Sequence, residues 1–148
     1  MVVSDGSQRV YLDTNVFINY LYDEARVDLV EASEDVFDAV VACRFFLVVS
    51  DVTVREIVKV TGFSRDEVFQ QVFRPYLALS KMELVQLNGE AAEEATYYSS
   101  IFGVHMLDAF HMALASLHRC WLVTFDGDLK DAASRAGLRV FDPRDLGL

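Results

Sequence analysis

Short apolar runs alternate with longer stretches of helical periodicity along this chain, and this alternation most limits its fold. The runs FFLVV and WLVTF are apolar throughout, as expected for parallel strands that helices cover on both faces. The predicted strands are residues 9–12, 46–49, 83–87, 121–124 and 139–141. The predicted helices begin at Asn15 and then cover 27–43, 51–61, 64–79, 90–101, 107–118 and 127–136. The sequence therefore predicts an α/β domain.

The length and composition indicate one domain over residues 1–148. A chain of 148 residues with 53% apolar composition can bury one sizeable core. No apolar run is long enough to cross a bilayer, and the N-terminal MVVSDGSQRV lacks the pattern of a signal peptide. We expect a cytoplasmic protein with no membrane partner, in which Cys43 and Cys120 are reduced core thiols.

The net charge of −10 argues against a broad basic face for nucleic acid. The charges are unevenly distributed, however. Residues 44–81 contain six basic and four acidic side chains, whereas residues 82–118 contain five acidic and no basic ones. We expect any contact with a polyanion to involve the second and last quarters of the chain, although a solvated helix face is the simpler explanation for most single arginines.

Acidic side chains follow predicted strands at the points where the strands end. Asp13 comes directly after the first strand, Ser50 and Asp51 after the second, and Asp126 and Asp128 shortly after the fourth. Ligands of parallel α/β sheets collect at the carboxyl ends of the strands. As single residues, Asp13, Asp51 and Asp126 also suit helix N-caps, because a carboxylate accepts a backbone N–H there.

Two further acids lie within predicted helices. Glu56 interrupts the apolar series of helix 51–61, although an exposed helix face is an alternative. Asp108 has small or apolar neighbours and no basic residue nearby in sequence, so an unpaired charge would be costly there. Clustered carboxylates repel one another, and a divalent cation removes this repulsion. A cleft of carboxylates without Cys or His ligands favours Mg²⁺ or Mn²⁺ over Zn²⁺, and such an ion can activate water for attack on a phosphodiester.

Four motifs resemble those of the PIN-domain family, small metal-dependent nucleases best known as VapC-type toxins. They are YLDTNVFINYL, VVSDVTVREIV, LDAFHMALA and LVTFDGDL, in this order along nearly the whole chain. Their polar residues are Asp13, Thr14, Asn15, Ser50, Glu56, Asp108, Thr124, Asp126 and Asp128. The first and third motifs are moderately specific, and the order and spacing of all four strengthen the match.

The resemblance implies a PIN-like three-layer α/β/α sandwich with a central, mainly parallel sheet of about five strands. It also implies cleavage of single-stranded RNA by activated water with Mg²⁺ or Mn²⁺, a VapB-type antitoxin as partner, and a homodimer. The segment of about residues 67–101 resembles the lid or dimer region of such proteins.

The resemblance also suggests roles for the motif residues. Asp13, Asp108 and Asp126 would bind the metal, with Asp128 as a supplement, and Glu56 would bind a second ion or position the water. Asn15 and Thr124 would orient these ligands by hydrogen bonds, and Ser50 would support the second motif, although Asn15 also suits ordinary first-turn polarity. His111 lies one turn after Asp108, and we predict a partly buried, neutral core histidine there.

Two alternatives assign no nuclease activity to the chain. A receiver-like signalling domain also binds magnesium at strand ends, but it requires an acid pair after the first strand and a lysine after a late strand. The stretch LDTN offers a single acid, and Lys130 falls inside a predicted helix. A PIN-like fold that only binds its partners is the second alternative, which the four motif acids disfavour.

Overall fold

The sheet of this protein has five parallel strands in the order β3-β2-β1-β4-β5. The computed structural model describes residues 6–22 and 26–148, so residues 1–5 of the N-terminal stretch considered as a signal peptide lie outside the described residues. The strands are β1 (Gln8–Leu12), β2 (Phe45–Ser50), β3 (Met82–Val85), β4 (Trp121–Val123) and β5 (Val140–Phe141). The predicted α/β class and five-stranded parallel sheet are confirmed.

The strand order excludes the receiver-like alternative. Receiver domains have the order 2-1-3-4-5, whereas here the chain runs outward from β1 to β3 and then returns to β4 on the other side of β1. The switch point of this doubly wound sheet therefore lies between β1 and β4, which are paired through Val10 and Trp121, Tyr11 and Leu122, and Leu12 and Val123.

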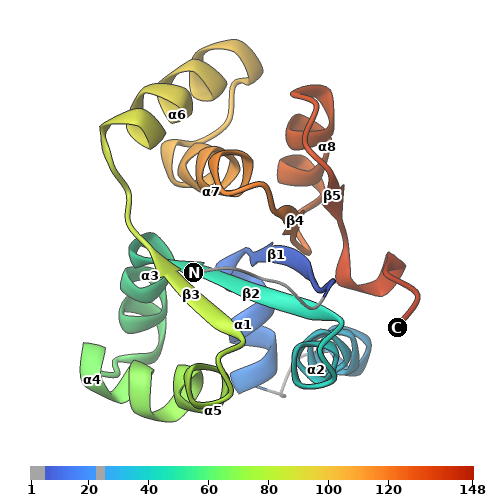
Figure 1. The fold of residues 1–148 in the computed structure, drawn as a ribbon. Coiled ribbons are helices and arrows are strands. Elements are labelled where there is room, and N and C mark those ends of the chain that lie inside the picture. The colour runs from blue at the N-terminus through green and yellow to red at the C-terminus, as the bar shows by residue number, and fades with distance from the viewer. Residues whose placement is uncertain (1–5, 23–25) are drawn as a thin grey trace.

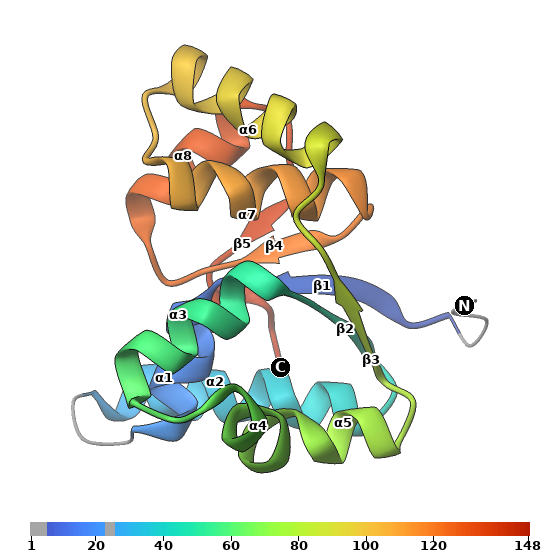
Figure 2. The same ribbon diagram turned by 90° about the vertical axis from the view of Figure 1, so that its left-hand side faces the viewer.

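Helices cover both faces of the sheet (Figures 1 and 2). One face carries α1 (Thr14–Leu21), α2 (Val27–Val41), α3 (Asp51–Thr61), α4 (Arg65–Val68) and α5 (Arg74–Ala78), and the other carries α6 (Gly89–Phe102), α7 (Met106–Leu117) and α8 (Gly127–Arg135). Alternate residues of β1 point to opposite faces. Val10 and Leu12 belong to the core with Phe17 and Phe37, whereas Tyr11 belongs to the core with Met112.

The predicted helix 64–79 is interrupted in the structure. Ser64 and Glu67 form the predicted capping box, but a π-helical segment, Phe69–Phe73, separates α4 from α5. Pro75 lies in the first turn of α5, where its missing N–H costs little. The segment 67–101 also contains β3, which pairs with β2, and the fully buried Phe73, so part of it belongs to the core.

Three smaller expectations were wrong. Cys120 is buried as predicted, but Cys43 is exposed, because it lies in the tight turn after α2 with a φ of 64°. The predicted third strand 83–87 ends at Val85. The N–H of Leu87 instead donates to a carboxylate oxygen of Asp51 at 3.0 Å. Asp51 is therefore not an N-cap; the cap of α3 is Ser50, whose side chain accepts from the Thr53 N–H. None of the described helices is long and apolar enough to cross a membrane.

An ion pair near the C-terminus makes the stability depend on pH. The guanidinium of Arg144 donates to both carboxylate oxygens of Asp142, at 2.9 and 2.7 Å, and its hydrogen bonds and charge lower the pKa of Asp142 from the ordinary value near 3.8. The stabilisation is therefore present above pH 4 and is lost as the pH falls through the lowered pKa. We expect Asp142→Asn to lower the free energy of unfolding by about 1 kcal/mol at pH 7, with the difference shrinking by pH 3.

Urea unfolding at the two pH values measures this difference. Asp145→Asn is the matched control, because Asp145 is exposed and its contact with Lys130 is longer, at 3.3 Å. A cost of Asp142→Asn that is the same at pH 7 and pH 3 would contradict the prediction.

Candidate metal and phosphodiester site

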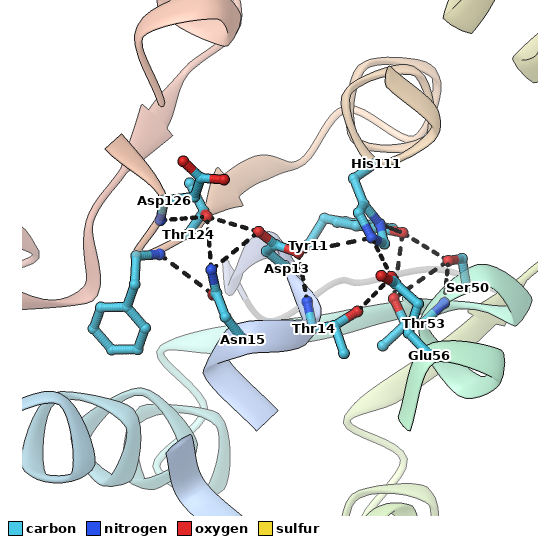
Figure 3. Close-up of polar contacts among 11 residues, drawn as sticks. Tyr11, Asp13, Thr14, Asn15, Ser50, Thr53, Glu56, His111, Thr124 and Asp126 are labelled. Atoms are coloured by element: carbon cyan, nitrogen blue, oxygen red, sulfur yellow. Dashed lines mark hydrogen bonds and ion pairs between the residues drawn. The ribbon is translucent and has the colours of Figure 1, made fainter. Parts of the chain in front are cut away.

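The first acid of the site lies at the switch point of the sheet. Asp13 follows β1, and its N–H donates to the carbonyl of Val123 at the end of β4 (2.9 Å). Its Oδ1 accepts the Thr14 N–H at 2.7 Å and caps α1, and its Oδ2 accepts from the Thr124 hydroxyl at 2.8 Å and the Asn15 amide at 3.2 Å (Figure 3). Asp13 is thus a helix cap, and Asn15 and Thr124 hydrogen-bond to its other carboxylate oxygen.

Burial sets the protonation behaviour of Asp13. Its side chain is only 10% exposed, and burial raises its pKa more than the charge of His111 and the hydrogen bond from Thr124 lower it. Asn15 also accepts the Phe125 N–H at 3.3 Å, so it joins the loops that follow β1 and β4. The carboxylate is therefore fixed in position before any ligand arrives.

Glu56 reaches the same region from α3. Its Oε1 accepts the Thr14 hydroxyl at 2.7 Å and lies 2.6 Å from Nε2 of His111. Although partial burial is the largest influence and raises its pKa, the hydrogen bond and charge of His111 and the hydrogen bond from Thr14 together lower it. Glu56 is therefore ionised at neutral pH, and its Oε2 accepts no hydrogen bond from the described residues.

His111 is buried as predicted, but both of its ring nitrogens contact polar side chains of the site. Its Nε2 contacts Glu56 and lies 3.7 Å from Oδ1 of Asp13, while its Nδ1 lies 2.6 Å from the Tyr11 hydroxyl. Burial alone would lower the pKa of His111, but the hydrogen bond with Glu56 and the charges of Asp13, Glu56 and Asp108 raise it above its ordinary value. An imidazolium here donates to Glu56 and Tyr11 at once.

The Tyr11 hydroxyl connects His111 to the second motif. It lies 2.6 Å from Oγ of Ser50, which in turn accepts the Thr53 N–H at 3.2 Å. Burial raises the pKa of Tyr11 well above its usual range, so the phenol stays protonated. Ser50 therefore supports the site through Tyr11 and His111, and does not contact the acids itself (Figure 3).

The remaining predicted acids line a cavity of about 380 Å³ between α7 and α8. Asp108, Asp126, Asp128 and Asp131 contribute to its walls. Asp126 caps α8 with Oδ1, and its Oδ2 accepts no hydrogen bond within residues 6–22 and 26–148. The carboxylate of Asp108 accepts none from this part of the chain, and its pKa is raised first by burial and then by the charges of Asp13, Asp126 and Glu56. Asp108 thus interacts electrostatically with three acids from other segments of the chain, Asp13, Glu56 and Asp126.

The donor chemistry of this cluster fits a hard divalent cation. The groups left without hydrogen-bond donors are carboxylate oxygens, which Mg²⁺ and Mn²⁺ prefer. The pKa of Asp108 is raised mainly by burial and further by the charges of the neighbouring acids, and a cation would offset this second contribution. Among the described residues, no group of three or more His, Cys, Asp or Glu side chains is already placed to hold a metal ion.

Four residues of the network were not among the predicted site residues. Tyr11, Thr14, Thr53 and His111 each hydrogen-bond within it. A hydroxyl at Tyr11, between the buried apolar residues Val10 and Leu12, was the clearest available signal, because a buried phenol requires a partner.

Comparisons with known proteins identify the family and agree with the fold. The family model of the PIN domain matches residues 10–135. FitAcB from Neisseria gonorrhoeae is 20% identical, with a TM-score of 0.67 over 93% of this chain and 99% of that chain. A toxin-antitoxin complex from Klebsiella pneumoniae is 25% identical, with a TM-score of 0.60 over 90% and 97%. VapBC-1 from nontypeable Haemophilus influenzae is 17% identical, with a TM-score of 0.62 over 92% and 98%.

A comparison with curated protein sequences finds no match. The family model nevertheless spans most of the chain, including all four acidic motifs. The chain therefore belongs to the PIN-domain family.

Proposed function

We propose that this protein is an endoribonuclease that requires Mg²⁺ or Mn²⁺ and cleaves single-stranded RNA by activated water. The observation that carries the proposal is Asp108, a half-buried carboxylate without a hydrogen-bond donor among the described residues, in the field of three further acids at the switch point of the sheet. Maintaining this repulsion is costly unless the cluster binds a cation.

The proposed roles of the acids are of two kinds, metal binding and positioning of water. Asp13, Asp108 and Asp126 would hold the ion, with the exposed Asp128 as a supplement. When bound there, the ion would supply activation of water and neutralise charge that develops on the phosphate. Glu56 is ionised, and its Oε2 accepts no hydrogen bond from the described residues, so it is suited to position the attacking water and to accept its proton.

The hydrogen-bond network keeps these carboxylates in place. Thr124 and Asn15 orient Asp13, whereas His111 and Thr14 orient Glu56. Partners of this kind behind metal-binding carboxylates commonly affect metal affinity or activity by 10–100-fold. Both acids are thereby preorganised for a ligand that approaches between them.

The proposal includes the role of toxin in a VapBC-type pair that acts in the cytoplasm. Structures similar to this chain are described as toxin-antitoxin complexes, including VapBC from Salmonella typhimurium bound to DNA. The net charge of −10 complements a basic antitoxin. A homodimer is also part of the proposal, because Tyr97 and Ile101 lie one turn apart on α6 and are 57% and 59% exposed.

Cleavage of a labelled single-stranded RNA with MnCl₂, with MgCl₂ and with excess EDTA tests the proposal. We expect cleavage with either ion, none with EDTA, and recovery when Mn²⁺ is added back. A DNA strand of the same sequence is the control for RNA specificity. If the purified protein binds RNA in Mn²⁺ but cuts none, the binding-module alternative replaces this proposal.

A further inference from the structure

An apolar recess of about 250 Å³ lies next to the acidic site, between α3 and α7. Its lining on α7 is Leu107 and Phe110, and Leu87 closes it from the segment between β3 and α6. Its lining on α3 includes Glu56, the same residue that contacts His111. This α3–α7 recess therefore shares a wall with the acidic site.

The helical register of α7 explains why the recess and the acids are adjacent. Asp108 and His111 are three residues apart and contribute to the acidic site, whereas Leu107 and Phe110, also three apart, lie one position round the helix. Leu107 is 50% exposed, so its side chain is accessible at the recess. The hydrogen bond from the Leu87 N–H to Asp51 fixes the opposite edge, so the recess is already formed without a ligand.

Two cations stand at the edge of the recess on α3. Arg55 and Lys59 are one helical turn apart, and both are exposed. Neither makes an ion pair or side-chain hydrogen bond in the part of the chain that the structure describes. The other side of the recess is formed by the segment 82–118, which contains no basic residue. In a chain of net charge −10, these two cations are therefore the only basic side chains among the described residues that line the recess.

We propose that the α3–α7 recess binds one nucleobase of single-stranded RNA next to the scissile phosphate, and that Arg55 and Lys59 bind a flanking phosphate. This inference rests on the proposed nuclease function and names a base-binding subsite for it. An aromatic side chain for stacking and a cationic edge for the backbone are the two features with which proteins bind single strands without reading their sequence. A basic segment of a protein partner is less suited, because Arg55 and Lys59 would repel it.

Binding of short RNA strands to Asp108→Asn protein, measured by fluorescence anisotropy, tests the subsite without cleavage. One abasic nucleotide is moved along the strand. We expect one position at which it weakens binding by about 10-fold, within the range for loss of one stacked base. Leu107→Ala and Phe110→Ala should weaken binding of the intact strand similarly, and should add little when the abasic nucleotide is at that position.

The cations are tested by the salt dependence of the same binding. The double variant Arg55→Gln/Lys59→Gln should reduce the slope of log K against log salt by about 0.7, the value for one phosphate contact in a single strand, whereas Leu107→Ala should leave the slope unchanged. Leu79→Ala is the apolar control, because Leu79 is also 50% exposed but lies at the end of α5. Arg44→Gln is the cationic control at the start of β2, at the opposite end of the sheet.

The inference is overturned if no abasic position matters and the Leu107 and Phe110 variants bind like Leu79→Ala, as a recess reserved for a protein partner would produce. Urea unfolding of each variant separates loss of binding from loss of fold. Failure of the nuclease proposal is a distinct result. In that case the wild type shows no Mn²⁺-dependent cleavage, whereas the anisotropy pattern still supports or overturns the subsite.

Discussion

Replacing Asp108 by asparagine is expected to lower the rate of RNA cleavage by at least about 100-fold. The substitution keeps the shape of the side chain but removes one of the acids that would hold the cation. Loss of several kcal/mol of charge stabilisation in the transition state corresponds to this factor, at 1.36 kcal/mol for each tenfold in rate. Asp66→Asn is the matched control, because Asp66 is exposed on α4, away from the site.

The same substitution should make the metal-free protein slightly more stable. The pKa of Asp108 is raised by burial and by the charges of Asp13, Asp126 and Glu56. A raised pKa means that the folded state disfavours the ionised form, so removing the charge stabilises the folded state at pH values above that pKa. Because the side chain is only half-buried, solvent screens the repulsion, and we expect a gain of roughly 0.5 kcal/mol in the free energy of unfolding.

Manganese should reverse this order of stability. A cation that binds only the folded state stabilises it in proportion to the logarithm of its concentration, so MnCl₂ should raise the melting temperature of the wild type more than that of Asp108→Asn. Thermal melts with EDTA and with MnCl₂ measure both effects. If Asp108→Asn is less stable than the wild type in EDTA, or if MnCl₂ raises the two melting temperatures equally, Asp108 is not part of a cation site.

The sequence predicted where the acids lie in the fold better than it predicted their hydrogen-bond partners. The strands and their parallel order followed from apolar runs whose two faces are both covered, and the carboxyl ends of such strands meet at one edge. Asp13 was correctly located for this reason, and its hydrogen bonds with Asn15 and Thr124 follow from the pairing of β1 with β4. Local sequence is sufficient to locate Asp13 and Thr124, because each lies directly after a strand.

The partners of Glu56 could not be predicted in the same way. One partner of Glu56 is His111, which in turn contacts Tyr11. His111 and Tyr11 are 100 residues apart in sequence, and their contact depends on how α7 packs on β1. Spacing within α7 placed His111 on the same face as Asp108, but it could not distinguish a ring surrounded by apolar groups from one between two acids. Likewise, Ser50 and Asp51 are both suitable caps for α3, and only the position of Leu87 determines that Asp51 binds a different N–H.

Replacing His111 by leucine is expected to have the largest effect on stability, a loss of about 3 kcal/mol in the free energy of unfolding. Leucine fills much of the volume but removes the only Lys, Arg or His side chain that contacts Asp13 and Glu56 within the described residues. Breaking a buried charge pair by removing one partner typically costs 3–5 kcal/mol. Glu56 is 27% exposed, so water reduces this cost to the lower end of the range.

A double-mutant cycle with Tyr11→Phe identifies the network as the cause. Tyr11→Phe alone should cost about 1 kcal/mol, because it leaves Nδ1 of His111 and the hydroxyl of Ser50 without one partner each. Once His111 is leucine, the Tyr11 hydroxyl has already lost that partner but still binds Ser50, so the double variant should be more stable than the sum of the single costs predicts, by about 0.5 kcal/mol. Urea unfolding at pH 7 provides the four free energies.

Two further variants separate charge from packing at this position. His105→Leu is the control, because His105 is exposed before α7 and its loss should change stability by less than about 0.5 kcal/mol. Adding Glu56→Gln to His111→Leu removes one of the two acids left without a cation, so it should restore part of the lost stability. If Glu56→Gln instead adds a further loss, the cost of His111→Leu arises from packing, and the imidazole does not serve to balance the acids.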